Sequence, residues 1–195
     1  MTLLRAFIAL EIPASIQESI QQQTAGLRKA ANSLVRWVPA ENLHLTLKFL
    51  GDVSSTSLQF VTQMLSREAS QYPGFSMQVG GLGAFPSARR ARVLWIGIRA
   101  PETLSALQRS LDSAATRLGY PPEDRPFSPH LTIGRVKQTA TPTDLQRIQA
   151  ALEAAAIGPL GKADVSAVHL IKSDLKPTGS VYTRLFSAPL KPLNP

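Results

Sequence analysis

The hydrophobic pattern of the chain alternates short apolar runs with longer segments whose apolar residues recur at helical spacing. The short runs predict strands at residues 5–12, 43–50, 75–85, 93–98, 130–136, 165–171 and 181–186. The amphipathic segments predict helices over residues 13–32, 54–72, 101–119 and 142–156. We expect Pro13 to begin the first helix, Ser54 to help cap the second, and Gly51-Asp52 to end the strand before it.

Helices and strands are interleaved in this pattern, but the strands are short and typical of hairpins. We therefore expect an α+β fold of antiparallel sheets with helices on their outer faces. Gly80, Gly81 and Gly83 interrupt the strand at 75–85 and predict bulges or a close backbone approach. No long linker divides the 195 residues, so we expect one domain made of two lobes that share a core.

Composition narrows the class of protein. No apolar run reaches the roughly 18 residues that a membrane helix needs. Glu11 and Pro13 interrupt the apolar start early, so we expect a first strand and not a signal peptide, and therefore a cytoplasmic protein. The absence of cysteine excludes disulfides and thiol chemistry. With 21 Lys and Arg against 13 Asp and Glu, the net charge is +8. This charge favours nucleic acid as a partner, although a solvated basic surface without a specific partner explains it equally well.

One short motif occurs twice. His44-Leu45-Thr46-Leu47 lies in the first half and His130-Leu131-Thr132-Ile133 in the second, each within a predicted strand that precedes a predicted helix. Two copies at half-chain spacing indicate a duplication and two lobes related by a pseudo-twofold axis. Because side chains alternate along a strand, the histidine and threonine of each copy point to one face and the aliphatic residues to the other. A cleft between the two sheets would then hold two imidazoles and two hydroxyls.

This set of side chains suits phosphodiester cleavage without a metal. One neutral imidazole takes a proton from water while a protonated imidazole gives a proton to the leaving oxygen, and a histidine pKa of about 6.5 allows both forms near neutrality. Threonine hydroxyls can donate to the non-bridging oxygens of the phosphate. A single H-x-T is more often structural, but two of the three histidines occupy equivalent positions here. We expect the third histidine, His169, to be a packing or surface residue. A zinc site made of all three histidines is the alternative.

At these residues the chain resembles the 2H phosphoesterase superfamily, and within it the RNA 2′,3′-cyclic phosphodiesterases, historically called 2′-5′ RNA ligases. The similarity extends over nearly the whole chain and is carried by residues 5–11, 41–51, 83–86, 129–135 and 173–175, with Tyr182. It implies a bilobal fold, hydrolysis of a terminal 2′,3′-cyclic phosphate to a 2′-phosphate without cofactor or metal, and a reversible, ATP-independent joining of RNA ends. It further implies that His44 is the proton donor, that His130 is the base, and that Thr46 and Thr132 hold the phosphate.

Four further residues are candidates for substrate binding. Arg135 matches a family arginine that contacts the substrate, but strict alternation from His130 aims it away from the cleft unless Gly134 hosts a bulge. Alternation from His44 aims Lys48 into the cleft, where it could screen phosphate charge or simply be a solvated lysine. Tyr182 and Phe49 could pack against a base or ribose, or belong to the core.

Three other functions remain open from the sequence. A related esterase could use the same residues on a small cyclic nucleotide. The fold could also serve as a non-catalytic nucleotide- or RNA-binding module, although a binder does not need both histidines. A zinc hydrolase that uses His169 is the remaining alternative. We expect a monomer, because no apolar stripe is left over for an interface.

Overall fold

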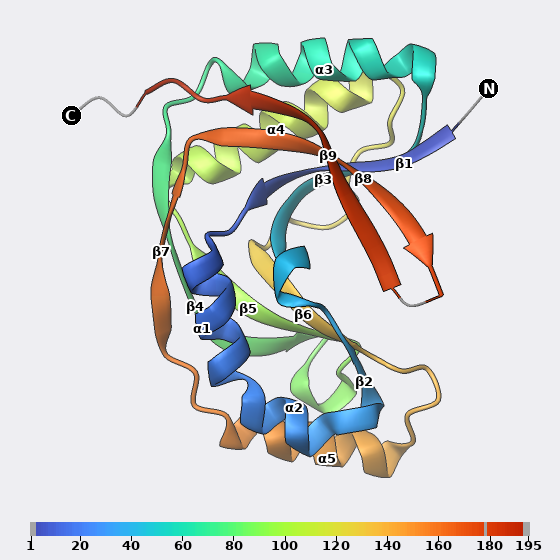
Figure 1. Ribbon diagram of the computed structural model, residues 1–195, viewed down its shortest axis with the longest axis vertical. Helices are drawn as coiled ribbons and strands as arrows, with labels where there is room; N and C mark the ends of the chain where they lie inside the picture. Colours follow the sequence, from blue (N-terminus) through green and yellow to red (C-terminus); the bar gives the residue numbers. More distant parts are fainter. Residues whose placement is uncertain (1–2, 178, 193–195) are drawn as a thin grey trace.

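The computed structural model describes residues 3–177 and 179–192 and consists of two antiparallel sheets flanked by helices (Figure 1). The first sheet has the strand order β3 (His44–Ser54), β1 (Leu3–Glu11), β8 (Ala167–Lys176) and β9 (Gly179–Pro189). The second has the order β2 (Val35–Trp37), β6 (His130–Val136), β5 (Val93–Arg99), β4 (Phe75–Phe85) and β7 (Pro159–Val165). All neighbouring strands in both sheets run antiparallel. The α+β fold with antiparallel sheets is therefore confirmed.

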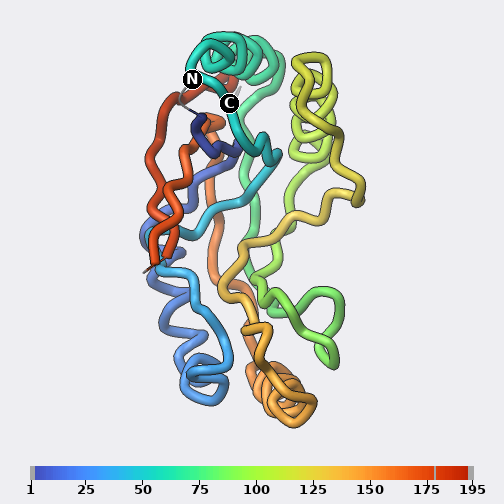
Figure 2. The backbone as a smooth tube through the Cα atoms, turned by 90° about the vertical axis from the view of Figure 1, so that its right-hand side faces the viewer, coloured from blue at the N-terminus to red at the C-terminus, as the bar shows by residue number. Residues whose placement is uncertain are grey.

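Helices cover the outside of this pair of sheets. They are α1 (Ala14–Gln23), α2 (Ala25–Ala31), α3 (Ser55–Ala69), α4 (Glu102–Arg117) and α5 (Pro142–Ala154), with 3₁₀ turns η1 (Asn32–Leu34), η2 (Ala40–Asn42) and η3 (Ala88–Arg90). Helices α3 and α4 pack on strands of the first sheet, whereas α1 contacts β7 and α2 packs on α5. In the side view α3 and α4 lie side by side at one end, and α2 and α5 at the other (Figure 2). None of the described helices combines the length and apolar composition that crossing a membrane requires.

The two sheets share one hydrophobic core. Ile8 and Leu45 of the first sheet belong to the same buried cluster as Ile96 and Leu131 of the second, and none of the four is more than 1% exposed. Each such side chain stabilises the fold by about 1.5–3 kcal/mol relative to its exposed state. We call the opposite face of each sheet, whose side chains stay out of this cluster, its open face. The twofold relation between the halves remains a prediction.

The first predicted helix is broken. Thr24 ends α1, and its buried hydroxyl donates to the carbonyl of Ile20 at 2.7 Å. A threonine side chain that bonds to the backbone one turn earlier weakens the regular helix. The chain therefore restarts as α2 and continues to Ala31, close to the predicted end. The predicted cap of α3 is confirmed, since the side chain of Ser54 accepts from the amide of Ser57.

The strands differ from the prediction in extent and in number. Strand β3 does not end at Gly51-Asp52 but continues to Ser54, because Gly51 adopts a positive φ of 69° and lets the strand continue past an irregularity in its pairing with β1. Strand β7 was missing from the prediction. It contains Pro159 and Gly161, which are unfavourable inside a sheet but tolerated on the edge strand that β7 forms.

Candidate active site

The two H-x-T motifs lie at the starts of β3 and β6, one in each sheet. His44, Thr46, His130 and Thr132 are partly exposed on the open faces, whereas the aliphatic residues between and after them are at most 2% exposed. Strands β3 and β6 contact each other in the middle of the molecule (Figure 2). The alternation that the sequence predicted for these four residues is confirmed.

The two histidines are held in the same way. Nδ1 of His44 lies 2.7 Å from the carbonyl oxygen of Asn42, and Nδ1 of His130 lies 2.6 Å from that of Ser128. Because a carbonyl can only accept, each Nδ1 carries the proton, and the reactive nitrogen of each ring is Nε2. This carbonyl two residues earlier therefore fixes both the tautomer and the orientation of each imidazole.

Aromatic rings support both imidazoles. Phe7 stacks on His44 with ring centroids 4.7 Å apart, and Tyr182 meets the same ring edge-on at 5.2 Å. Phe85 of β4 meets His130 edge-on at 4.9 Å. Tyr182 therefore lies beside the first histidine, and its packing against a base or ribose remains a prediction. Phe7 and Phe85 were not singled out as site residues, although both lie in the segments that carry the family resemblance.

Both motif strands contain a bulge at the same place. In β3 the pairing with β1 steps from Thr46 to Lys48, and in β6 the pairing with β5 steps from Thr132 to Gly134, so one residue after each threonine is left unpaired. The extra residue changes the face on which later side chains lie. The bulge that Arg135 required is therefore present, and Arg135 is exposed on the open face.

The expectation that Lys48 points into the cleft is wrong. The bulge turns Lys48 to the core side, where it is 1% exposed and its Nζ lies 2.6 Å from Oδ1 of Asp112 in α4. The following residue, Phe49, is instead turned outward and is 56% exposed, with its ring centroid 6.2 Å from that of Phe7. Strict alternation failed because it does not allow for an unpaired residue.

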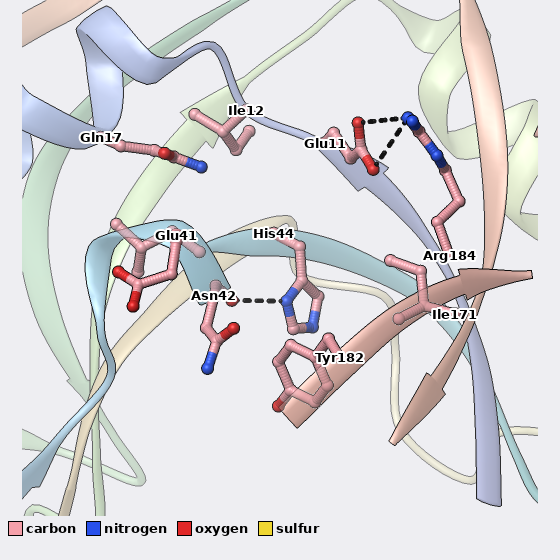
Figure 3. Close-up of a pocket in the computed structure, with 10 residues that line it drawn as sticks. Glu11, Ile12, Gln17, Glu41, Asn42, His44, Ile171, Tyr182 and Arg184 are labelled. Carbon is pink, nitrogen blue, oxygen red and sulfur yellow. Dashed lines mark hydrogen bonds and ion pairs between the residues drawn. The ribbon is translucent and has the colours of Figure 1, made fainter. Parts of the chain in front are cut away.

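A groove of about 450 Å³ opens beside His44 (Figure 3). Its polar lining includes Glu11, Gln17, Glu41, Asn42 and Arg184, and the ring of Tyr182 lines it next to His44. Arg184 Nη1 lies 3.2 and 3.0 Å from the two carboxylate oxygens of Glu11. The sequence analysis missed this pair, because residues 173 positions apart in the chain meet only through the order of strands in the first sheet.

His169 is a packed side chain close to this groove. It is 9% exposed, its Nδ1 is 2.9 Å from the hydroxyl of Ser187, and its Nε2 is 3.9 Å from Glu11. Burial lowers its pKa; the negative charge of Glu11 raises the pKa and the positive charge of Arg184 lowers it further. Within residues 3–177 and 179–192, no three His, Cys, Asp or Glu side chains are grouped so that they could hold a metal ion.

Comparison with known protein families matches residues 12–177 to the 2′-5′ RNA ligase superfamily. The chain belongs to this superfamily. The resemblance inferred from the two H-x-T motifs is therefore confirmed. The match includes both motif strands and the groove residues between Ile12 and Ile171, whereas Glu11, Tyr182 and Arg184 lie outside it.

Members of the superfamily resemble the chain over 67% to 97% of its length. It is 37% identical over 179 residues to an RNA 2′,3′-cyclic phosphodiesterase of Methanothermobacter thermautotrophicus, covering 92% of this chain and 95% of the relative. It is also 37% identical over 132 residues to the enzyme of the same name from Escherichia coli, covering 67% and 71% of the two chains. The crystal structure of E. coli LigT complexed with 3′-AMP superposes with a TM-score of 0.76 at 31% identity, covering 97% and 99%.

Proposed function

We propose that the protein hydrolyses the 2′,3′-cyclic phosphate at the end of an RNA to a 2′-phosphate. The observation that carries this proposal is the pair of imidazoles, each held through Nδ1 by a backbone carbonyl, on two strands that meet from different sheets. The superfamily relatives named RNA 2′,3′-cyclic phosphodiesterase support the same substrate. The net charge of +8 favours RNA, while a small cyclic nucleotide that fits the groove beside His44 is the second candidate.

The reaction needs one base and one acid on opposite sides of phosphorus. His130 Nε2 takes a proton from water as the water oxygen bonds to phosphorus, and the bond between phosphorus and O3′ breaks. His44 donates its proton to O3′, which leaves a 2′-phosphate. Each proton transfer contributes about 10²- to 10⁴-fold, and holding the groups in line supplies the correct geometry. The two histidines carry out both proton transfers, so the reaction as written uses no cofactor. We expect the protein to be a monomer and to lie in the cytoplasm.

An oligoribonucleotide with a 2′,3′-cyclic phosphate end tests this proposal. Incubation in the presence of EDTA should convert the end to a 2′-phosphate, because O3′ is the leaving oxygen and the two imidazoles perform both proton transfers. The product end is identified by mass spectrometry and by comparison with 2′- and 3′-phosphate standards. Formation of a 3′-phosphate would contradict the assignment of the leaving oxygen. Turnover of small cyclic nucleotides alone would favour the second candidate.

The two threonines should stabilise the charge that develops on the phosphate. Replacing Thr46 or Thr132 by valine keeps the shape of the side chain but removes the hydroxyl donor, so we expect kcat to fall by about 10²-fold. Serine at either position keeps the hydroxyl and serves as the matched control. Steady-state kinetics of Thr132→Val and Thr132→Ser should therefore differ, and equal rates for the two variants would show that the hydroxyl has no role.

The charge state of His44 should depend on substrate. Burial lowers the pKa of His44 below 6.5, and the hydrogen bond to Asn42 offsets this effect only in part. The ring is therefore neutral in the free protein at pH 7, and a bound phosphate should raise its pKa because an anion favours the protonated form. An NMR titration should place the midpoint below 6.5 in the free protein and higher with bound 2′-AMP. A midpoint that does not rise with 2′-AMP would contradict His44 as the proton donor.

A further inference from the structure

The backbone carbonyl that holds His44 belongs to a segment outside the strands of the first sheet. Asn42 is the last residue of the 3₁₀ turn η2, and its backbone N–H donates to the carbonyl of Pro39 within that turn, at 3.0 Å. The pairing of β3 with β1 begins at His44, opposite Glu11, so the carbonyl of Asn42 lies beyond this ladder. A single 3₁₀ turn has poor hydrogen-bond geometry, so its position depends on further contacts.

One such contact comes from the other edge of the sheet. Nδ2 of Asn42 donates to the carbonyl oxygen of Ser180 in β9 at 3.0 Å. Because a carbonyl can only accept, the nitrogen of the Asn42 amide, and not its oxygen, must face Ser180. Strands β3 and β9 form opposite edges of the first sheet, so this hydrogen bond connects the segment before one edge strand to the start of the other.

The start of β9 also supplies a ring against His44. Tyr182 follows Ser180 by two residues, and its ring meets the imidazole edge-on at 5.2 Å (Figure 3). Strand β9 therefore supports His44 twice. It does so directly through Tyr182, and indirectly through Asn42, whose carbonyl oxygen lies 2.7 Å from Nδ1 of the imidazole.

The second imidazole lacks an equivalent connection. The carbonyl of Ser128 holds His130, and within residues 3–177 and 179–192 the side chain of Ser128 makes no hydrogen bond. The contact between Asn42 and Ser180 is therefore particular to the strand of His44 and is not a general feature of the H-x-T motif.

We propose that Asn42 is a positioning residue for the proton donor. Its side-chain amide, bonded to Ser180, holds in place the carbonyl that aims Nε2 of His44 at O3′. This inference rests on the proposed hydrolysis and on its assignment of His44 as the acid. Asn42 transfers no proton itself. Without its hydrogen bond to Ser180, the carbonyl can move, and it no longer fixes the orientation of the imidazole or the nitrogen that gives up its proton.

Two variants and two substrates test this role. Asn42→Ala removes the amide, and Asn42→Asp keeps its size but replaces the donor by an acceptor. We expect both variants to lower kcat on a cyclic-phosphate oligonucleotide by about 10- to 100-fold, the usual cost of a misplaced catalytic group, with KM nearly unchanged in Asn42→Ala. A substrate with sulfur in place of O3′ needs no proton donor, because a thiolate leaves without protonation. On this substrate the kcat of both variants should return to the wild-type value.

An NMR titration of His44 gives a second readout that does not depend on turnover. The hydrogen bond to Asn42 raises the pKa of His44, so Asn42→Ala should lower its midpoint further. The substitution leaves in place the other titratable groups around the imidazole, namely Glu11, Glu41, Tyr182 and Arg184 of the groove, His169 next to Glu11, and His130 on β6. A midpoint that stays the same would contradict the role of Asn42 in holding the carbonyl.

Gln149→Ala is the matched control, because it removes a side-chain amide whose hydrogen bond, to Glu153, lies within the outer helix α5, and it should leave both reactions unchanged. Equal losses of Asn42→Ala on the two substrates would overturn the proposal, since a residue that only stabilised the fold or bound the substrate would act on both. An active wild-type protein with an unchanged kcat in Asn42→Ala would refute this role alone. A wild-type protein that hydrolyses neither substrate would refute the proposed function as well.

Discussion

Replacement of His130 by alanine is expected to lower the rate of cyclic phosphate hydrolysis by about 10²- to 10⁴-fold, the usual contribution of a general base. His44→Ala should cause a loss of similar size, because O3′ would then leave without a proton. Both rings lie on open faces and make one hydrogen bond each to a backbone carbonyl, so the core survives their removal. Steady-state kinetics and thermal unfolding of the two variants measure the two effects separately.

The third histidine provides the control for this experiment. His169 is buried against Ser187 and contacts no motif residue among the interactions described above. His169→Gln should therefore keep most of the activity. Near-normal turnover in His44→Ala or His130→Ala would refute two-histidine catalysis, whereas a loss as large in His169→Gln would point to a general effect of histidine removal on the fold.

Replacement of Asp112 by alanine is expected to destabilise the protein by about 3 kcal/mol or more, because it leaves the ammonium group of Lys48 buried without its main partner. Glu123 lies 3.8 Å from the same nitrogen and is partly exposed, which should keep the loss at the lower end of the usual range. The midpoint of urea unfolding and its slope give the change in the free energy of unfolding.

A second substitution tests whether the destabilisation comes from the unpaired charge of Lys48 or from the loss of the Asp112 side chain itself. Lys48→Met has a similar volume and no charge, and it leaves unpaired the carboxylate of Asp112, which is 21% exposed and can be hydrated. We therefore expect a smaller loss than in Asp112→Ala, and the double variant should recover most of the lost stability. Lys48 also donates to the carbonyl of Pro121, in the loop that leads to His130. A double variant as unstable as Asp112→Ala alone would contradict the buried charge as the cause.

The common face of the histidine and threonine in each H-x-T motif could be predicted from the sequence because strand periodicity is local. Given His44 and Thr46 two residues apart, their common face follows from the pleat of the strand, and the structure agrees. The same rule failed for Lys48, because a bulge depends on how two strands pair, and that pairing is fixed by the whole sheet. For Arg135 the sequence held a local cue, since Gly134 is the residue that fits against Val35 and Trp37.

Features that depend on distant partners could not be predicted. The Glu11–Arg184 pair requires the order of strands in the first sheet, which hydrophobic spacing does not give. The break at Thr24 reflects a side-chain hydrogen bond that competes with the helix. Strand β7 was missed because its proline and glycine resemble a loop, and only its place at a sheet edge allows them.

The central claim is that His44 protonates the leaving oxygen while His130 activates the attacking group. A cyclic substrate with sulfur in place of O3′ tests it, because a thiolate with a conjugate-acid pKa of about 8.5 leaves without protonation. The rates of both alanine variants are measured on this substrate and on the normal one. We expect the sulfur substrate to restore His44→Ala to near the wild-type rate and to leave His130→Ala impaired. Restoration of His130→Ala instead, or of neither variant, would contradict the assignment.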